Sequence, residues 1–213
     1  PEGHAFCQEI LFKKIKYFGS FWGMSKLKKL DLGNNPTLEC VFLKNVNVED
    51  DTIFENLKEV NVSKCKNLRV IDIEQAGEKF TELDLSSNDK LNSLGLEGLR
   101  GLKQLKMPET DNLKEIVVKE TALESLALEK YTKLDKVCVG GNQFDILKIN
   151  MEQKTEKDIE NMYLLFDNNL KVEFISSKSG IVPNIKRLDN HNLWAGIVFS
   201  NYVVTDYEIP ECW

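Results

Sequence analysis

The chain has 213 residues, of which 42% are apolar, and its 28 basic and 34 acidic side chains give a formal net charge of −6 at pH 7. A mild negative charge provides no basic surface for nucleic acid or for an anionic membrane, so neither is expected as a partner. No uncharged stretch reaches the ~18 residues of a membrane-spanning helix, so no membrane span is expected. The first residues also lack the basic start and apolar core of a signal peptide.

The first 26 residues carry apolar side chains at helical spacing, with polar residues between them: Phe6, Ile10, Leu11, Ile15 and Phe18. This pattern predicts an amphipathic helix of about four turns. Because the open end of a repeat structure needs a cover, we expect residues 1–26 to form an N-terminal helical cap and a loop. Phe21 and Trp22 are expected to plug that end rather than to anchor a ligand.

Residues 27–150 repeat one template, whose copies begin at residues 27, 57, 80, 102, 123 and 144. The five complete copies have apolar residues at all 30 of their offsets 0, 3, 5, 11, 14 and 16, whereas the sixth copy, FDILKI, stops halfway. The complete copies are LKKLDLGNNPTLECVFL, LKEVNVSKCKNLRVIDI, FTELDLSSNDKLNSLGL, LKQLKMPETDNLKEIVV and LESLALEKYTKLDKVCV. Repetition at a fixed period indicates coils that stack on one another and form one continuous domain.

Each copy begins with the pattern LxxLxL, which alternates apolar and polar residues as a strand does. Asn35 and Asn88 stand at offset 8, where Cys65, Thr110 and Tyr131 replace them in the other copies. A buried Asn at this position can bond the turn backbone of adjacent coils. Tyr131 cannot fit in the same way, so we expect either a distorted coil or a ring that points outward.

These copies resemble the leucine-rich repeat family, whose LxxLxLxxN core recurs here with substitutions. The second half of each copy repeats LxxLxL, and the last three steps of 22, 21 and 21 residues leave little room for a helix. The expected fold is therefore mainly β with a few helices: a flattened right-handed solenoid with two parallel sheets. It is similar to the short two-strand repeats of some bacterial surface proteins. The resemblance implies protein binding, and it favours a secreted or cell-surface location.

The first step is longer than the others because residues 46–56 are inserted after the first coil. This insertion contains Glu49, Asp50 and Asp51, and we expect it to bulge from the rim of the solenoid. It is interpreted either as part of a functional face or as a solvated loop.

Residues 151–213 are expected to form a C-terminal cap of helix and strands, with a small independent domain as the alternative. Thr155 and Asp158 have the spacing of a helix start, and the predicted helix carries Ile159, Met162, Tyr163 and Phe166 on one face. Residues 170–175 alternate as a strand, and residues 185–194 resemble a degenerate repeat. The tail, residues 197–213, is expected to form one or two strands that close this end.

The candidate binding residues are the outward side chains at offsets 2 and 4 of the first four copies. They are Lys29, Asp31, Glu59, Asn61, Glu82, Asp84, Gln104 and Lys106. We expect an acidic patch over the early coils and a more basic surface later, which suits a protein partner or a polar ligand. A solvated surface that prevents aggregation is the alternative.

On the second sheet the outward column is Phe42, Asp72, Gly95, Val117 and Cys138. It is expected either to contact another domain or subunit or to present scattered exposed apolar residues.

The sequence offers little for catalysis or metal binding. No catalytic motif surrounds His4 or His191. His4 and Cys7 have a helical i, i+3 spacing that could supply two metal ligands, but a second pair of ligands is missing. Among the five cysteines, Cys40, Cys65 and Cys138 are expected to be structural thiols, whereas Cys7 and Cys212 lie in the terminal segments. No catalytic residue, metal or cofactor is assigned.

The leading hypothesis is therefore a non-enzymatic protein-binding or scaffold module, favoured as a monomer. One alternative is an effector or enzyme whose residues 151–213 act through His191 and Cys212. The other is a structural spacer in a larger surface protein.

Overall fold

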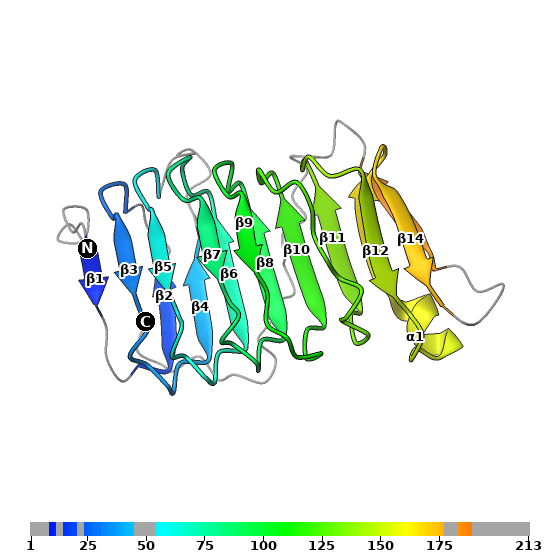
Figure 1. Ribbon diagram of the computed structural model, residues 1–213, viewed down its shortest axis with the longest axis horizontal. Helices are drawn as coiled ribbons and strands as arrows, with labels where there is room; N and C mark the ends of the chain where they lie inside the picture. The colour runs from blue at the N-terminus through cyan, green and yellow to red at the C-terminus, as the bar shows by residue number, and fades with distance from the viewer. Residues whose placement is uncertain (1–8, 12–14, 21–23, 45–53, 177–182, 189–213) are drawn as a thin grey trace.

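The computed structural model describes residues 9–11, 15–20, 24–44, 54–176 and 183–188. These residues are mostly β, with very little helix, and they form a parallel β-solenoid of about seven turns (Figure 1). The solenoid fold predicted from the repeats is confirmed. Each coil passes from one long side of the solenoid to the other and back, so residues about one repeat apart in sequence become neighbours in space.

One long side of the solenoid is a continuous sheet of eight strands, in which every neighbouring pair is parallel. The spatial order of the strands follows the chain, as a solenoid requires. The strands are β2 (Tyr17–Ser20), β4 (Cys40–Leu43), β6 (Val70–Glu74), β8 (Ser93–Glu97), β10 (Glu115–Lys119), β11 (Lys136–Gly140), β13 (Tyr163–Asp167) and β15 (Ile185–Leu188).

The opposite side is divided, among the described residues, into three short parallel sheets. The first contains β1 (Glu9–Leu11), β3 (Lys29–Asp31) and β5 (Glu59–Asn61); the second contains β7 (Glu82–Asp84) and β9 (Gln104–Lys106); the third contains β12 (Ile146–Asn150) and β14 (Lys171–Ile175). The expected second sheet is thus not continuous. The strands β3, β5, β7 and β9 are only three residues long, and a side-chain-bonded turn follows each of the first three.

The apolar offsets of the template meet in one hydrophobic core between the two sides. Leu30, Val60, Leu83 and Leu126 are buried, and Leu105 is partly buried against the same core. A parallel interior file, formed by Val41, Ile71, Leu94, Ile116 and Val137, is fully buried under the eight-stranded sheet. Each coil therefore supplies apolar side chains to its neighbours as well as to itself, which is why a single coil has no core of its own.

Backbone hydrogen bonds join the coils outside the strands as well. The residue that precedes each of β4, β6, β8, β10 and β11 donates its N–H to the carbonyl of the equivalent residue one coil earlier, at Glu39→Lys16, Arg69→Glu39, Asn92→Arg69, Lys114→Asn92 and Asp135→Lys114. Tyr163, the first residue of β13, donates to the Asp135 carbonyl, and the N···O distance is 2.8 Å in all six cases. This ladder satisfies backbone groups in the bends, where burial without a partner would be costly.

The chain leaves four successive strands of the large sheet through a left-handed residue. These residues are Gln75, Gly98, Glu120 and Gly141, with φ of 55°, 68°, 49° and 66°. Glycine adopts this conformation without steric cost, whereas Gln75 and Glu120 accept a modest penalty. The N–H groups of these two residues donate to the next coil: Gln75 donates to the Glu97 carbonyl and Glu120 to the Gly140 carbonyl.

The asparagine positions bond adjacent coils as expected. Asn35 Oδ1 accepts from the Ile15 N–H at 2.9 Å, and Asn88 Nδ2 donates to the carbonyl oxygens of Val62 and Cys65 at 3.0 and 3.1 Å. Cys65 replaces asparagine and places its Sγ 3.1 Å from the Leu32 carbonyl oxygen. The interior position therefore holds a polar side chain that bonds the preceding coil, as a donor at Cys65 and Asn88 and as an acceptor at Asn35.

Tyr131 occupies the same position with its ring inward and fully buried, so an outward ring is ruled out. Its hydroxyl donates to the Pro108 carbonyl at 2.7 Å, one coil back, which replaces the asparagine bond from a longer side chain. The coil that contains Tyr131 is distorted, which was the other of the two expectations for this residue. The first half of this coil forms no strand and pairs only through a bridge between Leu128 and Ile149.

The predicted N-terminal helix is wrong, because the described residues between 9 and 20 form β1 and β2. Ile10 pairs with Leu30 in β3, and Phe18 pairs with Val41 in β4. These residues make one more coil rather than a helical cap. Apolar residues three apart occur in an amphipathic helix and in this repeat alike, so Ile15 and Phe18 fit both patterns. Phe21 and Trp22 lie outside the described residues.

The helix predicted at Thr155 is confirmed, although it is short. Helix α1 (Glu156–Asn161) begins with a capping box, in which the Asp158 N–H donates to Thr155 Oγ1 at 3.1 Å and the Thr155 N–H donates to Asp158 Oδ2 at 2.8 Å. Met162 is already extended, and Tyr163 and Phe166 belong to β13 rather than to the helix.

The described part of residues 151–213 extends the solenoid. β13 and β15 continue the large sheet, and β14 pairs with β12 on the opposite side. The predicted strand at 170–175 and the predicted degenerate repeat at 185 are thereby explained as a further coil. The expected closing strands at 197–213 lie outside the described residues.

The inserted segment is only partly described. Glu49, Asp50 and Asp51 lie outside the described residues, but Phe54, near its end, is fully buried and forms a bridge with Ala76. The end of the insertion thus belongs to the core.

Along β7, Leu83 faces the core and its neighbour Glu82 faces outward, so substitutions at these two positions test the orientation of the strand. Leu83→Ala removes a side chain with 1% exposure and should lower the free energy of unfolding by about 2–5 kcal/mol. Glu82→Ala, one residue earlier and facing outward, should cost at most ~1 kcal/mol. Urea unfolding followed by circular dichroism measures both; equal costs would contradict the assigned orientation of β7.

Candidate functional site

The eight candidate residues lie on one side of the solenoid, on strands β3, β5, β7 and β9. The two outward residues of each strand flank one residue of the core. Hydrogen-bonded register places them in two groups, one on β3 and β5 and the other on β7 and β9. The sequence therefore identified a shared face, although the face is formed by two separate sheets.

In the first group, each outward residue of β3 contacts the residue opposite it on β5. Lys29 is opposite Glu59, and their Nζ and Oε1 atoms are 2.9 Å apart. Asp31 is opposite Asn61, whose Nδ2 donates to Asp31 Oδ1 at 2.9 Å.

The second group is organised around Lys106. Its Nζ lies 2.6 Å from Glu82 Oε1 and 3.4 Å from Asp84 Oδ2. Asp84 is its partner in register, whereas Glu82 is opposite Gln104. One lysine therefore bridges both acidic residues of β7.

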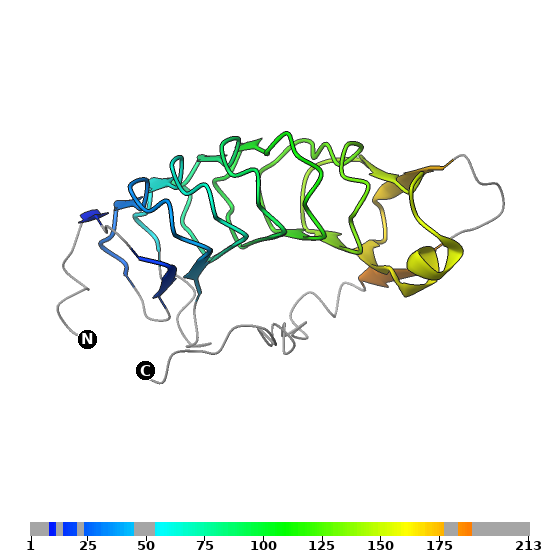
Figure 2. The ribbon, with the colours of Figure 1, turned by 90° about the horizontal axis from the view of Figure 1, so that it is seen from below.

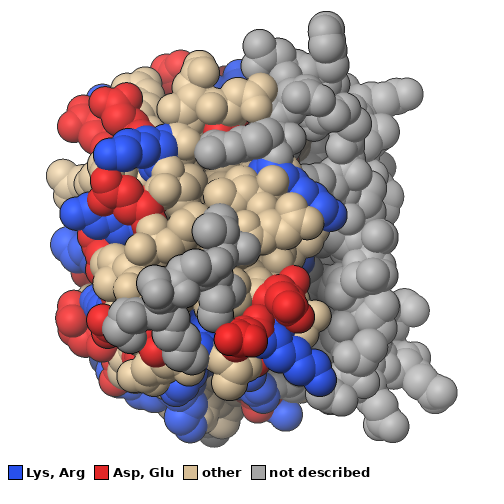
Figure 3. All heavy atoms as spheres, turned by 90° about the vertical axis from the view of Figure 1, so that its right-hand side faces the viewer, with Lys and Arg blue, Asp and Glu red and all other residues tan. Residues whose placement is uncertain are grey.

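These ion pairs change the expected electrostatics of the face. The acidic residues of the early coils do not stand alone, because Lys29 neutralises Glu59 and Lys106 neutralises Glu82 and Asp84. The mixture of signs continues to the C-terminal end of the solenoid, where Lys171 Nζ is 2.8 Å from Glu173 Oε1 and Figure 3 shows basic and acidic side chains next to one another. Exposed pairs of this kind contribute at most ~1 kcal/mol each, so a binding partner can replace them at little cost.

The outward residue at offset 4 also holds the turn that follows its strand. Asp31, Asn61 and Asp84 accept from the N–H two residues later, at Gly33, Ser63 and Ser86, over 2.9, 3.1 and 3.0 Å. Their recurrence as Asp-x-Gly, Asn-x-Ser and Asp-x-Ser was visible in the sequence but was not interpreted as a turn. Three of the eight candidate binding residues thus also have a structural role.

The outward column of the eight-stranded sheet differs from this face, because it is largely buried. Asp72 and Val117 are 6% and 2% exposed, so the expectation of scattered exposed apolar residues is wrong. Lys44 Nζ lies 2.6 Å from Asp72 Oδ2 and 2.9 Å from Glu74 Oε1. A Cβ at Gly95 would lie 2.5 Å from Asp72 Oδ1, so glycine leaves room for this carboxylate.

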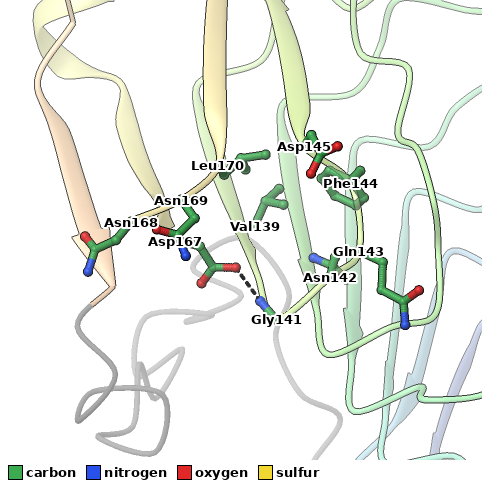
Figure 4. A pocket seen from close by; sticks show the side chains of 10 residues that line it. All are labelled: Val139, Gly141, Asn142, Gln143, Phe144, Asp145, Asp167, Asn168, Asn169 and Leu170. Atoms are coloured by element: carbon green, nitrogen blue, oxygen red, sulfur yellow. Dashed lines mark hydrogen bonds between the residues drawn. The ribbon is translucent and has the colours of Figure 1, made fainter.

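A pocket of about 350 Å³ lies between two successive turns, after β11 and after β13 (Figure 4). Part of its polar wall is occupied by contacts within the protein. The Gly141 N–H donates to Asp167 Oδ2 at 2.6 Å, and Asn142 Oδ1 accepts from Thr121 while its Nδ2 donates to the Val118 and Gly140 carbonyls. These groups hold the turns together. The rest of the polar lining consists of Gln143, Asp145, Asn168 and Asn169.

The described cysteines are suited to packing rather than to chemistry. Cys40, Cys65 and Cys138 are free and buried, as predicted, and burial raises the pKa of each thiol to about 11. Such thiols stay protonated at neutral pH and are poor nucleophiles. His4, His191, Cys7 and Cys212 lie outside the described residues.

Within the described ranges no group of three or more His, Cys, Asp or Glu side chains is placed to hold a metal ion. None of the helices in this part of the chain has the length and apolar character to cross a membrane.

Comparison of the sequence with protein-family models and with curated proteins finds no match. The site must therefore be interpreted from its own geometry.

The pKa of Asp84 is lowered mainly by the Ser86 hydroxyl and N–H, and then by Lys106. Ser86→Ala should therefore raise this pKa toward its usual value of ~3.9, as followed by NMR titration of the carboxyl carbon. A carboxyl pKa that is lowered in the folded state stabilises the protein above its unfolded value, and this stabilisation is lost as the pH falls. The variant should thus be less stable than wild type above about pH 4, with a difference that vanishes in acid.

Asp158 provides a control within the same spectra. Its pKa is lowered by Thr155 in the α1 capping box and should not respond to Ser86→Ala. An unchanged pKa at Asp84 would show that the turn contact is not formed in solution.

Proposed function

We propose that the chain is a leucine-rich-repeat type recognition module, and that it binds a protein partner through the outward side chains of β3, β5, β7 and β9. The observation that carries the proposal is the face itself. Eight polar side chains stand in register on short strands, and their ion pairs, Lys29 with Glu59 and Lys106 with Glu82 and Asp84, lie at the exposed surface. The proposal assigns no catalytic step, cofactor or metal to the chain.

Two features support the repeat type. The template combines LxxLxL with a polar residue at offset 8, and that residue bonds the preceding coil at Asn35, Cys65 and Asn88. In the first four copies, the LxxLxL segment of the first half forms the short strand that displays the candidate residues. In leucine-rich repeats this arrangement is associated with protein recognition.

The chemistry of the face favours a protein over a small ligand. Neighbouring strands are ~4.8 Å apart, so the two columns span an extended surface rather than a cavity. Positive and negative groups are mixed along it, which suits a partner with a complementary pattern of charges. The rigid strands pre-organise these groups, and pre-organisation lowers the entropic cost of association.

Charge exchange tests the proposal while it keeps the two shorter ion pairs of the face. Lys29→Glu with Glu59→Lys, combined with Lys106→Glu and Glu82→Lys, reverses the direction of these two pairs, and only the longer contact of Lys106 with Asp84 is lost. Wild-type and variant chains are immobilised and exposed to extracts and culture fluid of the organism that produces the protein. Bound proteins are quantified by mass spectrometry. Partners of the wild type should be captured roughly tenfold less by the variant, because complementary charges would meet like charges.

The matched control exchanges Lys130 and Glu109, an exposed pair 3.0 Å apart that lies outside the four strands. This variant should retain the partners of the wild type. The proposal is contradicted when the four-residue variant captures the same proteins, in the same amounts, as the wild type and the control.

A further inference from the structure

The pocket between the turns after β11 and β13 follows from a change in turn length. Residues 141–145 connect β11 to β12, whereas only residues 168–170 connect β13 to β14 one coil later. The shorter turn does not cover the whole of the longer one, which leaves the pocket of about 350 Å³ between them (Figure 4). All of its lining residues belong to the described part of the chain.

Backbone contacts show where the two coils separate. In the three preceding coils, the left-handed residue after the strand donates its N–H to a backbone carbonyl one coil later. The Gly141 N–H instead donates to the Asp167 carboxylate. The pairing of β11 with β13 also ends at Val139, although Gly140 is still paired on the side of β10. The shorter turn therefore departs from its neighbour at the point where the pocket opens. Figure 2 shows these turns at the end of the solenoid that carries α1.

Four exposed polar side chains of the two turns are available to a ligand. They are Gln143, Asp145, Asn168 and Asn169. Within the described part of the chain, none of the four forms a side-chain hydrogen bond or ion pair. Asn142, in the same wall, by contrast uses its amide within the protein. Each free amide can both donate and accept, and the free carboxylate of Asp145 can accept.

The base of the pocket is apolar. Val139, Phe144 and Leu170 are 1%, 8% and 6% exposed, and all three belong to the main hydrophobic core. In the view of Figure 4, Leu170 and Val139 lie between Asp145 on one turn and Asn169 on the other. An apolar base with a few polar groups around it is the usual composition of a small-molecule site.

The lining disfavours several classes of ligand. It contains no Lys or Arg, and the carboxylates of Asp145 and Asp167 would repel an anion. An apolar ligand would remove water from the free amides without replacing their hydrogen bonds, which is costly. A metal ion such as Ca²⁺ needs several oxygen ligands, whereas Asp167 already accepts from Gly141 and leaves Asp145 as the one uncommitted carboxylate of the lining.

We propose that this pocket binds one residue of a neutral carbohydrate. Sugar hydroxyls both donate and accept, so they match three amides and one carboxylate, and the C–H face of a sugar ring packs on the apolar base. The pocket volume lies near the lower end of the ~300–1,000 Å³ range of small-molecule sites, which suits a single sugar ring rather than a longer glycan. The pocket lies outside the face formed by β3, β5, β7 and β9, so either assignment can fail without the other.

NMR titration of the full-length chain tests the proposal. The ¹⁵N-labelled protein is titrated with glucose, galactose, mannose and N-acetylglucosamine, each to ~100 mM, because a single sugar has few atoms and should bind with a dissociation constant on the order of 1–10 mM. At least one of the four should shift the amide signals of residues 141–145 and 167–170, while the signals of β3 and β5 stay in place. The proposal is overturned when none of them shifts these turn signals.

Two exposed substitutions locate the binding. Asp145→Ala with Asn169→Ala removes one free polar group from each turn and should weaken sugar binding at least roughly tenfold. The matched control is Glu124→Ala with Asn34→Ala. Glu124 stands at the same offset as Asp145 one coil earlier, and both control residues are exposed and lie outside the pocket. The control should bind as the wild type does. Equal affinity in the pocket variant, or an equal loss in both variants, contradicts the assigned site.

Two further probes separate the proposed chemistry from its alternatives. Inorganic phosphate and tetramethylammonium chloride are titrated under the same conditions as the sugars. Neither should shift the signals of residues 141–145 and 167–170 in the way that the sugar does. A response to tetramethylammonium without a response to any sugar would assign the pocket to a cationic ligand and overturn the proposal.

Discussion

The structure depends on the contact between one coil and the next. Backbone groups of each strand bond the equivalent strand of the neighbouring coil, and the ladder from Lys16 to Tyr163 continues this bonding through the bends. The apolar side chains at the template offsets fill the space between the two sides, so that each coil completes the core of its neighbours. A chain of local repeats thus obtains a core through stacking alone, without contacts between distant parts of the sequence.

The same constraint explains where the coils can vary. Interior positions tolerate a change only when the new side chain still reaches the preceding coil, as Tyr131 does through its hydroxyl to the Pro108 carbonyl. The outward positions of the short strands are free of that requirement and carry mixed charges, whereas the long sheet buries several of its outward residues, such as Asp72, Val117 and Cys138. We therefore propose recognition on the side with the short strands, where the surface is polar.

Much of the fold followed from the sequence, because strict spacing of apolar residues determines which side chains face inward. The predicted helix start at Thr155 was correct for a local reason, since a capping box requires only Thr155 and Asp158. The N-terminal helix was wrong because Ile15 and Phe18 satisfy two periods at once, and only pairing with β3 and β4 decides between them. Shared outward columns were predictable for the candidate face, but ion pairing around Lys106 depends on rotamers that no spacing specifies.

Hydrogen exchange at the centre of the stack tests this account most directly. Amides of β8, which pairs with β6 and β10, should be strongly protected, whereas amides in the turn at residues 109–112 should exchange rapidly. Protection in β8 that is no greater than in this turn would contradict the stacking of coils on which the fold and both surface assignments rest.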